Sequence, residues 1–449
     1  MDKRINLIEG NISKALIKLA LPIMATSFIQ MLYNLTDTMW LGRLSTEAAA
    51  AAGTAGFYMW IGASLVLICQ IGVSVGVAQG YGRKDLEDVK CYISNGLKLD
   101  LMIGIIYSLF LILFRNELIG YFNLDDMVTI DLAIRYLVII AYGLIFSFIS
   151  PVFSAIYNAV GNSFLPFVIS SLGVIANMVL DPLLIFGIGP FPALGIEGAA
   201  LATVLSQVLV TIVYLLVSRR NTMLFSHLNL LKFPNVDYII KIFKLGFPAC
   251  LQSGIHATIS MILTRILAKW GSTTVAVSSI GSQIESITWM TTEGFSSAIT
   301  AFVGQNYGAK NYKRVKEGYY KGLKIVGAIG IFGTLLLMLA GEPIFKLFTP
   351  EDPLAISQGK TYLSILGISQ FFVAIEIASA GGFNGLGKTN IPAIIGGVLN
   401  ALRVPASYIL SNTALGMTGV WWSISISSVF KGIILTWLFI YVLKKELKV

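Results

Sequence analysis

The sequence predicts an all-α, polytopic membrane protein, with twelve transmembrane helices in two six-helix lobes related by a parallel pseudo-two-fold repeat. Three observations predict this class: a shortage of charge, twelve long apolar runs and an internal duplication. Of the 449 residues, 56% are apolar and only 12% are charged, whereas a soluble domain carries roughly 25% charged residues. The composition therefore excludes a typical soluble enzyme, a disordered chain and a nucleic-acid module.

Twelve apolar runs are long enough for the roughly 20 residues that a helix needs to cross a bilayer. In chain order they cover residues 14–40, 54–79, 93–114, 131–157, 164–187, 196–218, 240–268, 274–303, 318–340, 357–383, 391–411 and 418–442. The longest link between runs is rich in Arg, Asn and Pro, which are linker signals. We therefore expect a first lobe in 1–220, a cytoplasmic linker in 221–239 and a second lobe in 240–449.

The distribution of Lys and Arg predicts the orientation in the membrane. With the N terminus in the cytoplasm, the inner segments hold 23 of the 32 Lys and Arg residues, and the outer segments hold 4. Such an excess marks the cytoplasmic side of a membrane protein. We expect a multi-pass protein of the inner (plasma) membrane with both termini in the cytoplasm. The net charge of +9 then faces anionic lipid, and no nucleic-acid partner is expected.

The chain is an internal duplication, with an offset of 226 residues over most of its length and of 221 further on, where Leu194, Gly195 and Gly198 match Leu415, Gly416 and Gly419. The offset of 226 relates Lys18-Leu-Ala-Leu-Pro22 to Lys244-Leu-Gly-Phe-Pro248. It also relates Gln79, Tyr81, Gly82, Lys84 and Lys90 to Gln305, Tyr307, Gly308, Lys310 and Lys316, and Asn158, Gly161 and Pro166 to Asn384, Gly387 and Pro392. Six spans in each half give both halves the same orientation, so the repeat is parallel. Transporters commonly use such repeats, with the binding site between or inside the halves near the midplane.

Two aspartates within the predicted spans need an explanation, because a carboxylate inside a bilayer costs several kcal/mol. Asp37 lies late in the first span, and Asp181 lies in the fifth span, four residues after Asn177 on the same helix face. Asp37 corresponds to Leu263 at the offset of 226, and Asp181 corresponds to Val404 at a locally adjusted offset of 223. Two carboxylates with amide and hydroxyl oxygens suit a hard cation, such as Na⁺, or a proton. Buried structural pairs are the alternative.

Other polar residues within the spans are weaker candidates for a substrate cavity. Glu285 and Glu293, in the eighth span, lie two turns apart, and Glu376 lies in the middle of the tenth. Lining of a wet cavity, or pairing with Arg265 or Arg403, would explain these three acids equally well. The candidates are Gln30, Asn34, His256, Glu285, Glu293 and Glu376.

One motif imitates an enzyme signature. Residues 382–389 match the phosphate-binding loop pattern G-x-x-x-x-G-K-[ST], but that loop must follow a buried strand, and here it follows a predicted membrane span. A tight turn between the tenth and eleventh spans is the better interpretation. The sequence has no catalytic motif and only two histidines, so we expect a transporter rather than an enzyme, with no cofactor other than a coupling ion.

These features together resemble the multidrug and toxic compound extrusion (MATE) transporters, in their bacterial branch. The resemblance covers nearly the whole chain. It rests on Pro22 with Asp37, Ala78-Gln-Gly-Tyr-Gly82, Asn158 to Asn162, Asn177-Met-Val-Leu-Asp181-Pro182, Gly195 with Gly198-Ala-Ala-Leu-Ala-Thr203, and Gly304-Gln-Asn-Tyr-Gly-Ala309.

The resemblance implies a secondary active multidrug efflux transporter that works by antiport with Na⁺ or H⁺. It implies that Asp37 and Asp181 are the coupling acids, that Asn177 and Thr203 are oxygen ligands, and that Tyr136 supplies a neighbouring hydroxyl. Na⁺ would then bind at Asp37, Asn177, Asp181 and Thr203. The substrates would be amphipathic drugs or toxins, often cationic and aromatic, and the chain would work as a monomer in the lipid bilayer without an obligate protein partner.

The sequence departs from the family pattern in its second half. Some members carry acids in the seventh and tenth spans, whereas here the position in the seventh span is His256, and Glu376 lies near the position in the tenth, not on it. A lipid-linked oligosaccharide flippase of the same superfamily is the main alternative. A membrane-bound lipid transferase and a channel are weaker ones, because the sequence lacks a paired acidic or histidine motif, and a channel would not need acids in one half only.

Overall fold

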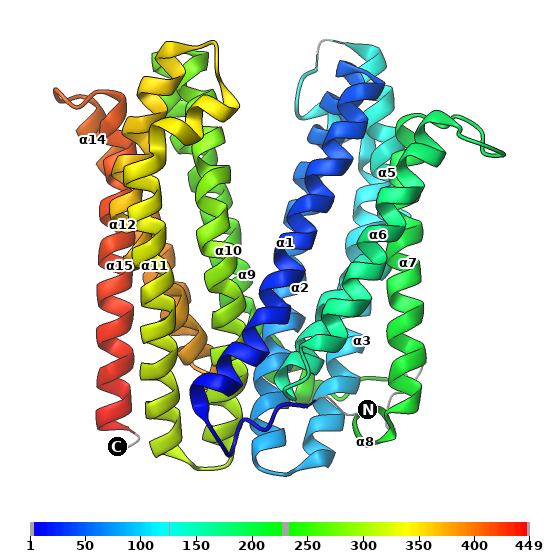
Figure 1. The fold of residues 1–449 in the computed structure, drawn as a ribbon. Coiled ribbons are helices and arrows are strands. Elements are labelled where there is room, and N and C mark those ends of the chain that lie inside the picture. Colours follow the sequence, from blue (N-terminus) through cyan, green and yellow to red (C-terminus); the bar gives the residue numbers. More distant parts are fainter. Residues whose placement is uncertain (1–3, 125, 227–232, 447–449) are drawn as a thin grey trace. The chain divides into compact units, whose positions relative to one another are not determined.

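The computed structural model describes residues 4–124, 126–226 and 233–446, and these residues form helices joined by short turns, without a strand. The helices of the first half are α1 (Ile12–Leu44), α2 (Thr46–Gly82), α3 (Leu86–Leu113), α4 (Arg115–Gly120), α5 (Met127–Ala159), α6 (Phe164–Phe186), α7 (Ile196–Arg220) and α8 (Thr222–Phe225) (Figure 1). Those of the second half are α9 (Val236–Leu267), α10 (Ser272–Gly308), α11 (Tyr312–Phe348), α12 (Pro353–Gly385), α13 (Asn390–Ala401), α14 (Arg403–Ser411) and α15 (Met417–Lys445). A single 3₁₀ turn, η1, covers Ala268–Trp270.

The twelve predicted spans are confirmed as twelve long helical segments. Among the described residues, ten segments are long and apolar enough to cross a membrane, and α13 with α14 counts as one of them, Asn390–Ser411. The other two segments are α9 and α10, with 32 and 37 residues. Ser and Thr residues lower the hydropathy of α10. The eleventh span is interrupted at Leu402, between α13 and α14, a break that the apolar run 391–411 does not reveal.

The helices group into two compact units, and the boundaries between the units divide two of the helices, α1 and α9. Of the described residues, one unit contains Arg4 and those within 25–250, and the other contains residues 5–24 and 251–446. The unit boundaries therefore fall inside α1 and inside α9, two residues after Pro22 and two residues after Pro248. The two boundaries are separated by the same 226 residues as the sequence repeat. A division of the chain at 221–239 remains a prediction about where the repeat begins.

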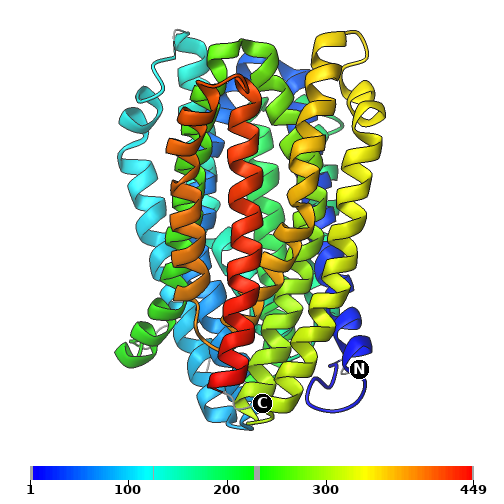
Figure 2. The same cartoon turned by 90° about the vertical axis from the view of Figure 1, so that its left-hand side faces the viewer.

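Each unit is a helix bundle around its own apolar core. In residues 25–250, α5 packs against α2, α3 and α7, and α7 also packs against α6. In the other unit, α12 is central and packs against α10, α11 and α15. Figure 2 shows α15, in red, between α12 and α14.

The backbone confirms the duplication. Left-handed conformations recur at equivalent turns: φ is 61° at Lys84 and 58° at Lys310, and 86° at Gly161 and 77° at Gly387. Outside glycine such values are uncommon, so their repetition at an offset of 226 indicates that each turn ends its helix in the same way.

Helix packing in the two units is equivalent as well. A Cβ atom added to Gly96 on α3 would lie 2.1 Å from Val73 Cγ2 on α2, and one added to Gly322 on α11 would lie 2.9 Å from Ile299 Cδ1 on α10. Both residues of the second pair follow those of the first by 226 positions. The α2–α3 and α10–α11 pairs are therefore packed through equivalent positions. A residue of one unit can be compared with the residue at the equivalent position of the other.

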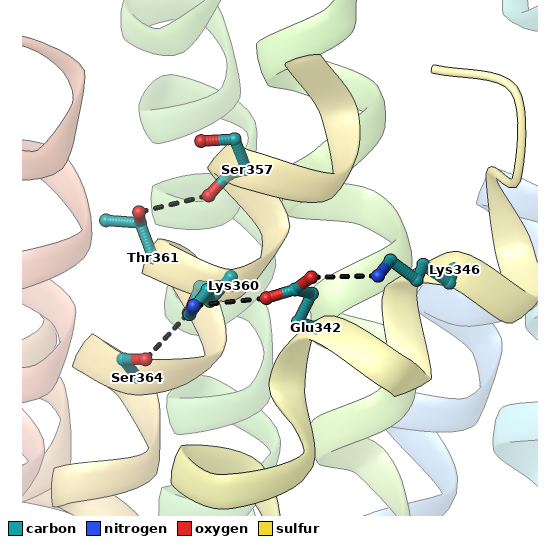
Figure 3. A network of polar contacts seen from close by, with 6 residues as sticks. All are labelled: Glu342, Lys346, Ser357, Lys360, Thr361 and Ser364. Atoms are coloured by element: carbon teal, nitrogen blue, oxygen red, sulfur yellow. Dashed lines mark hydrogen bonds and ion pairs between the residues drawn. The ribbon is translucent and has the colours of Figure 1, made fainter. Parts of the chain in front are cut away.

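Polar contacts at helix ends cap the start of α5 and join the end of α11 to α12. The Asp126 carboxylate caps α5 by accepting hydrogen bonds from the Thr129 hydroxyl (2.7 Å) and from the backbone N–H groups of Val128 and Thr129. These hydrogen bonds lower the pKa of Asp126 below its ordinary value. At the end of α11, Glu342 forms ion pairs with Lys346 on the same helix (2.9 Å) and with Lys360 on α12 (3.1 Å), as Figure 3 shows.

Candidate functional site

The two aspartates singled out in the sequence lie in the unit formed by residues 25–250, on α1 and α6. Asp181 is fully buried, and the Oδ1 atom of the half-buried Asp37 is buried as well. Asn177 precedes Asp181 by four residues on α6, and its amide Nδ2 donates a hydrogen bond to Asp181 Oδ1 at 3.3 Å. The i, i+4 spacing thus places the amide and the carboxylate together, as the sequence predicts.

Hydroxyl groups from three helices complete the cluster. The Tyr33 hydroxyl on α1 lies 3.1 Å from Thr203 Oγ1 on α7. Tyr136 on α5 is buried, and both tyrosines lie within electrostatic range of Asp37 and Asp181. The structure therefore brings together all five residues that the resemblance implies, from α1, α5, α6 and α7.

The cluster contains oxygen atoms that lack a donor. Asp37 Oδ1, Asn177 Oδ1 and Asp181 Oδ2 are buried, and no group of the described chain donates a hydrogen bond to them. No Lys or Arg of the described residues forms an ion pair with either carboxylate. An unsatisfied buried acceptor costs about 1–3 kcal/mol, and the three lie on residues that interact with one another through the Asn177–Asp181 hydrogen bond and the charge of Asp37 near Asp181. This set of acceptors fits a small cation or a proton chemically.

Sequence reasoning missed Tyr33. A signal was available, because Tyr33 precedes Asp37 by four residues and therefore lies on the same face of α1. By contrast, Gln30 and Asn34 are exposed on α1, so their side chains do not belong to the buried part of the cluster.

The second unit places acids next to basic residues instead. Glu376 on α12 forms an ion pair with Lys431 on α15, with Oε1 and Nζ 2.9 Å apart. Both residues are almost fully buried, at 8% and 7% exposure. Arg403, the first residue of α14, donates hydrogen bonds to the hydroxyls of Ser427 and Ser428 on α15.

The remaining candidates of this unit lie around these charges. Glu285 on α10 accepts a hydrogen bond from Gln370 Nε2 at 3.2 Å and lies within electrostatic range of Arg403. His256 on α9 lies within range of Arg403 and Lys431, whereas Glu293 is exposed on α10. In this unit Glu376 is therefore paired with a cation, and Glu285 lies near one although its buried Oε1 has no hydrogen-bond partner in the described chain. No cation of the described residues pairs with the Asp37–Asp181 cluster.

The segment 382–389 ends α12 and then forms a tight turn at residues 386–389, where the sequence predicts a turn between two spans. Gly382–Gly385 are the last residues of α12, Gly387 adopts a positive φ of 77°, and α13 begins at Asn390. The described residues contain no strand before this turn, so the context that a phosphate-binding loop requires is absent.

Comparisons with known proteins agree with this architecture. The MatE family model matches the chain twice, at residues 22–183 and 248–409, again with an offset of 226. The "Probable multidrug resistance protein NorM" of Thermotoga maritima is 30% identical over 91% of this chain and 88% of its own length. The "FAD transporter" of Shewanella oneidensis is 26% identical over 86% of this chain and 84% of its own length.

A solved structure shows the same fold. The structure described as "Crystal structure of MATE in the bent conformation" superposes with a TM-score of 0.90 and 26% identity, and the match covers all of both chains. The family model covers well over half of the chain, and the similarity to relatives extends over nearly its full length. The chain therefore belongs to the MatE family, a family of polytopic membrane transporters, and is not an enzyme.

Proposed function

We propose that this protein exports amphipathic, often cationic and aromatic compounds by antiport with Na⁺ or H⁺, which binds at Asp37 and Asp181. The observation that carries the proposal is the cluster of three buried oxygens without donors on Asp37, Asn177 and Asp181. A lone structural acid would be expected to have a donor or a basic partner, as Glu376 has in Lys431. The relative from Thermotoga maritima, named as a probable multidrug resistance protein, supports the substrate class.

The chemistry of the cluster suggests how ion and substrate are coupled. A cation or proton at the carboxylates removes their charge repulsion and supplies the missing donor or counter-charge. A conformation that keeps Asp37 near Asp181 is thereby stabilised relative to one that separates them. The coupling can be no larger than the difference in ion affinity between the two conformations. The Tyr33 hydroxyl and Thr203 Oγ1 lie 3.1 Å apart, and a hydroxyl oxygen in such a hydrogen bond keeps a lone pair with which it can bind a cation.

Transport in membrane vesicles tests the proposal. Vesicles containing the protein are loaded with a cationic fluorescent dye, and its movement is followed with a Na⁺ gradient at fixed pH, or with a pH gradient without Na⁺. We expect one of the two gradients to drive transport, and Asp37→Asn and Asp181→Asn to abolish it. Asp131→Asn is the matched control, because Asp131 is 58% exposed and paired with Arg135 on the same helix. Full ion-driven transport by either site variant would contradict the proposal.

The substrate class and the location need separate measurements. A panel of cationic dyes and anionic flavins would separate the proposed substrates from those suggested by the relative named as an FAD transporter. We also propose that the protein lies in the inner (plasma) membrane with both termini in the cytoplasm, on the basis of the Lys and Arg distribution. Protease accessibility of a C-terminal tag in intact cells and in everted vesicles checks the orientation.

A further inference from the structure

A third buried carboxyl group lies in the unit formed by residues 25–250, outside the Asp37–Asp181 cluster. Asp100 occupies the middle of α3 and has no solvent exposure. Both of its carboxylate oxygens are buried, and no N–H or O–H group in the described part of the chain donates a hydrogen bond to them; the thiol of Cys69 is their one hydrogen-bonding neighbour there. Leu97 and Leu99, its near neighbours in the helix, belong to the apolar core. This acid therefore lies in an apolar environment.

The helices around Asp100 supply one titratable neighbour. This is Cys69 on α2, whose thiol lies beside the carboxyl group. No charged side chain of the described parts of α2, α4, α5, α8 and α9, which pack on α3, acts on the Asp100 carboxyl group, Lys241 and Lys244 of α9 included. Lys98 lies two residues away, about 200° around the helix axis, and forms no ion pair with it. Asp37 on α1 and Asp181 on α6 have no electrostatic interaction with Asp100 either.

The repeat shows that packing at this position does not require an acid. The segment Gly96-Leu-Lys-Leu-Asp100 corresponds to Gly322-Leu-Lys-Ile-Val326 at the offset of 226. The two glycines make equivalent close contacts with the preceding helix, so the two segments occupy the same place in their units. Val326 is fully buried in its apolar core. A hydrocarbon side chain thus fills in one unit the position that Asp100 fills in the other.

The energetics favour a neutral acid in this conformation. An ionised carboxylate without a partner in an apolar interior costs several kcal/mol, and mid-membrane acids are expensive residues that usually mark proton or ion pathways. The protonated form avoids most of this cost. Valine would avoid all of it, as the second unit demonstrates. An acid at a position where valine suffices therefore indicates a role for the proton that it binds.

We propose that Asp100 is a second proton-binding site of this unit, separate from the Asp37–Asp181 cluster, which holds a proton in this conformation and exchanges it with water during the transport cycle. The exchange breaks the carboxyl O–H bond, leaves a carboxylate and transfers the proton to water, and rebinding reverses the step. Only the exchange rests on the proposed transport function. The bound proton can be measured without transport.

Infrared spectroscopy of the purified protein in lipid nanodiscs tests for the bound proton. A protonated carboxyl group gives a C=O stretching band that is separate from carboxylate bands and shifts in D₂O. At neutral pH we expect a band that disappears in both Asp100→Asn and Asp100→Val and persists in Asp131→Asn and Asp37→Asn. Asp100→Val copies the residue of the second unit, so it should fold even if the amide variant does not. An unchanged band in a folded Asp100→Val protein would overturn the proposal.

Dye transport in vesicles tests the exchange. We expect Asp100→Val to reduce the rate of ion-driven export by about fivefold or more, the lower end of typical coupling factors, at equal protein amount and equal thermal stability. Asp100→Glu, which keeps a carboxyl group, should restore part of the rate. Export at the wild-type rate by Asp100→Val at every pH tested would refute the exchange. A wild-type protein that shows no ion-driven export would instead refute the proposed function, and the infrared result would then still decide whether the proton is bound.

Discussion

Substitution of Glu376 by Gln should destabilise the protein more than substitution of its partner Lys431 by Met. The two side chains form an ion pair at 2.9 Å, and both are almost fully buried. Loss of one partner of a buried ion pair typically costs about 3–5 kcal/mol, because the other charge remains without compensation. Each single variant is therefore expected to lose about 3–5 kcal/mol of stability before its surroundings are considered.

The surroundings make the two variants unequal. Arg403 lies within electrostatic range of both Glu376 and Lys431. Glu376→Gln leaves two cations facing each other, whereas Lys431→Met leaves Glu376 close to the remaining cation. We therefore expect Glu376→Gln to reach or exceed the upper end of the 3–5 kcal/mol range and Lys431→Met to fall near its lower end. The double variant should be more stable than Glu376→Gln, because it also removes the Lys431 charge that Glu376→Gln leaves without a partner.

Thermal unfolding in detergent, followed by the loss of soluble monodisperse protein, measures the order of the three variants. The control is Glu342→Gln, which removes an exposed acid from two ion pairs on α11 and α12 (Figure 3). Exposed pairs contribute little to stability, so this control should unfold at the wild-type temperature. Equal losses in both single variants, or a double variant less stable than Glu376→Gln, would refute the reasoning from charge.

Two further predictions concern packing and the candidate site. Gly246→Ala should destabilise the protein by about 1–3 kcal/mol or more, since the added Cβ would lie 1.9 Å from the backbone oxygen of Ile68; Gly254→Ala on the same helix, with open space around it, should be neutral or slightly stabilising, and equal unfolding temperatures for the two would contradict this. Tyr33→Phe should lower stability by about 0.5–1.5 kcal/mol through loss of its hydrogen bond to Thr203. Thr203→Val should cost a similar amount and the double variant little more; additive losses in thermal unfolding would show that the two hydroxyls act independently.

Local patterns were sufficient to predict the twelve helices and the duplication. A run of apolar residues reveals a span wherever it lies, and an offset of 226 reveals the repeat without any knowledge of contacts. The pairing of Asn177 with Asp181 could also be predicted, because residues four positions apart share one face of a helix. Asp37 and Asp181 stand out for a similar reason, since acids are rare in apolar runs.

Contacts between helices could not be predicted in this way. The Tyr33 hydroxyl forms a hydrogen bond with Thr203, 170 positions away in the sequence. Glu376 forms its ion pair with Lys431, not with Arg265 or Arg403. The sequence also does not reveal that the boundaries between the two units lie inside α1 and α9. Nor does it reveal that no charged group of the described chain interacts with Asp100. Such contacts depend on how far each helix is rotated about its own axis and on which neighbour its faces meet. The packing of all the helices of a unit determines these rotations and neighbours, so they cannot be predicted from any single segment of the sequence.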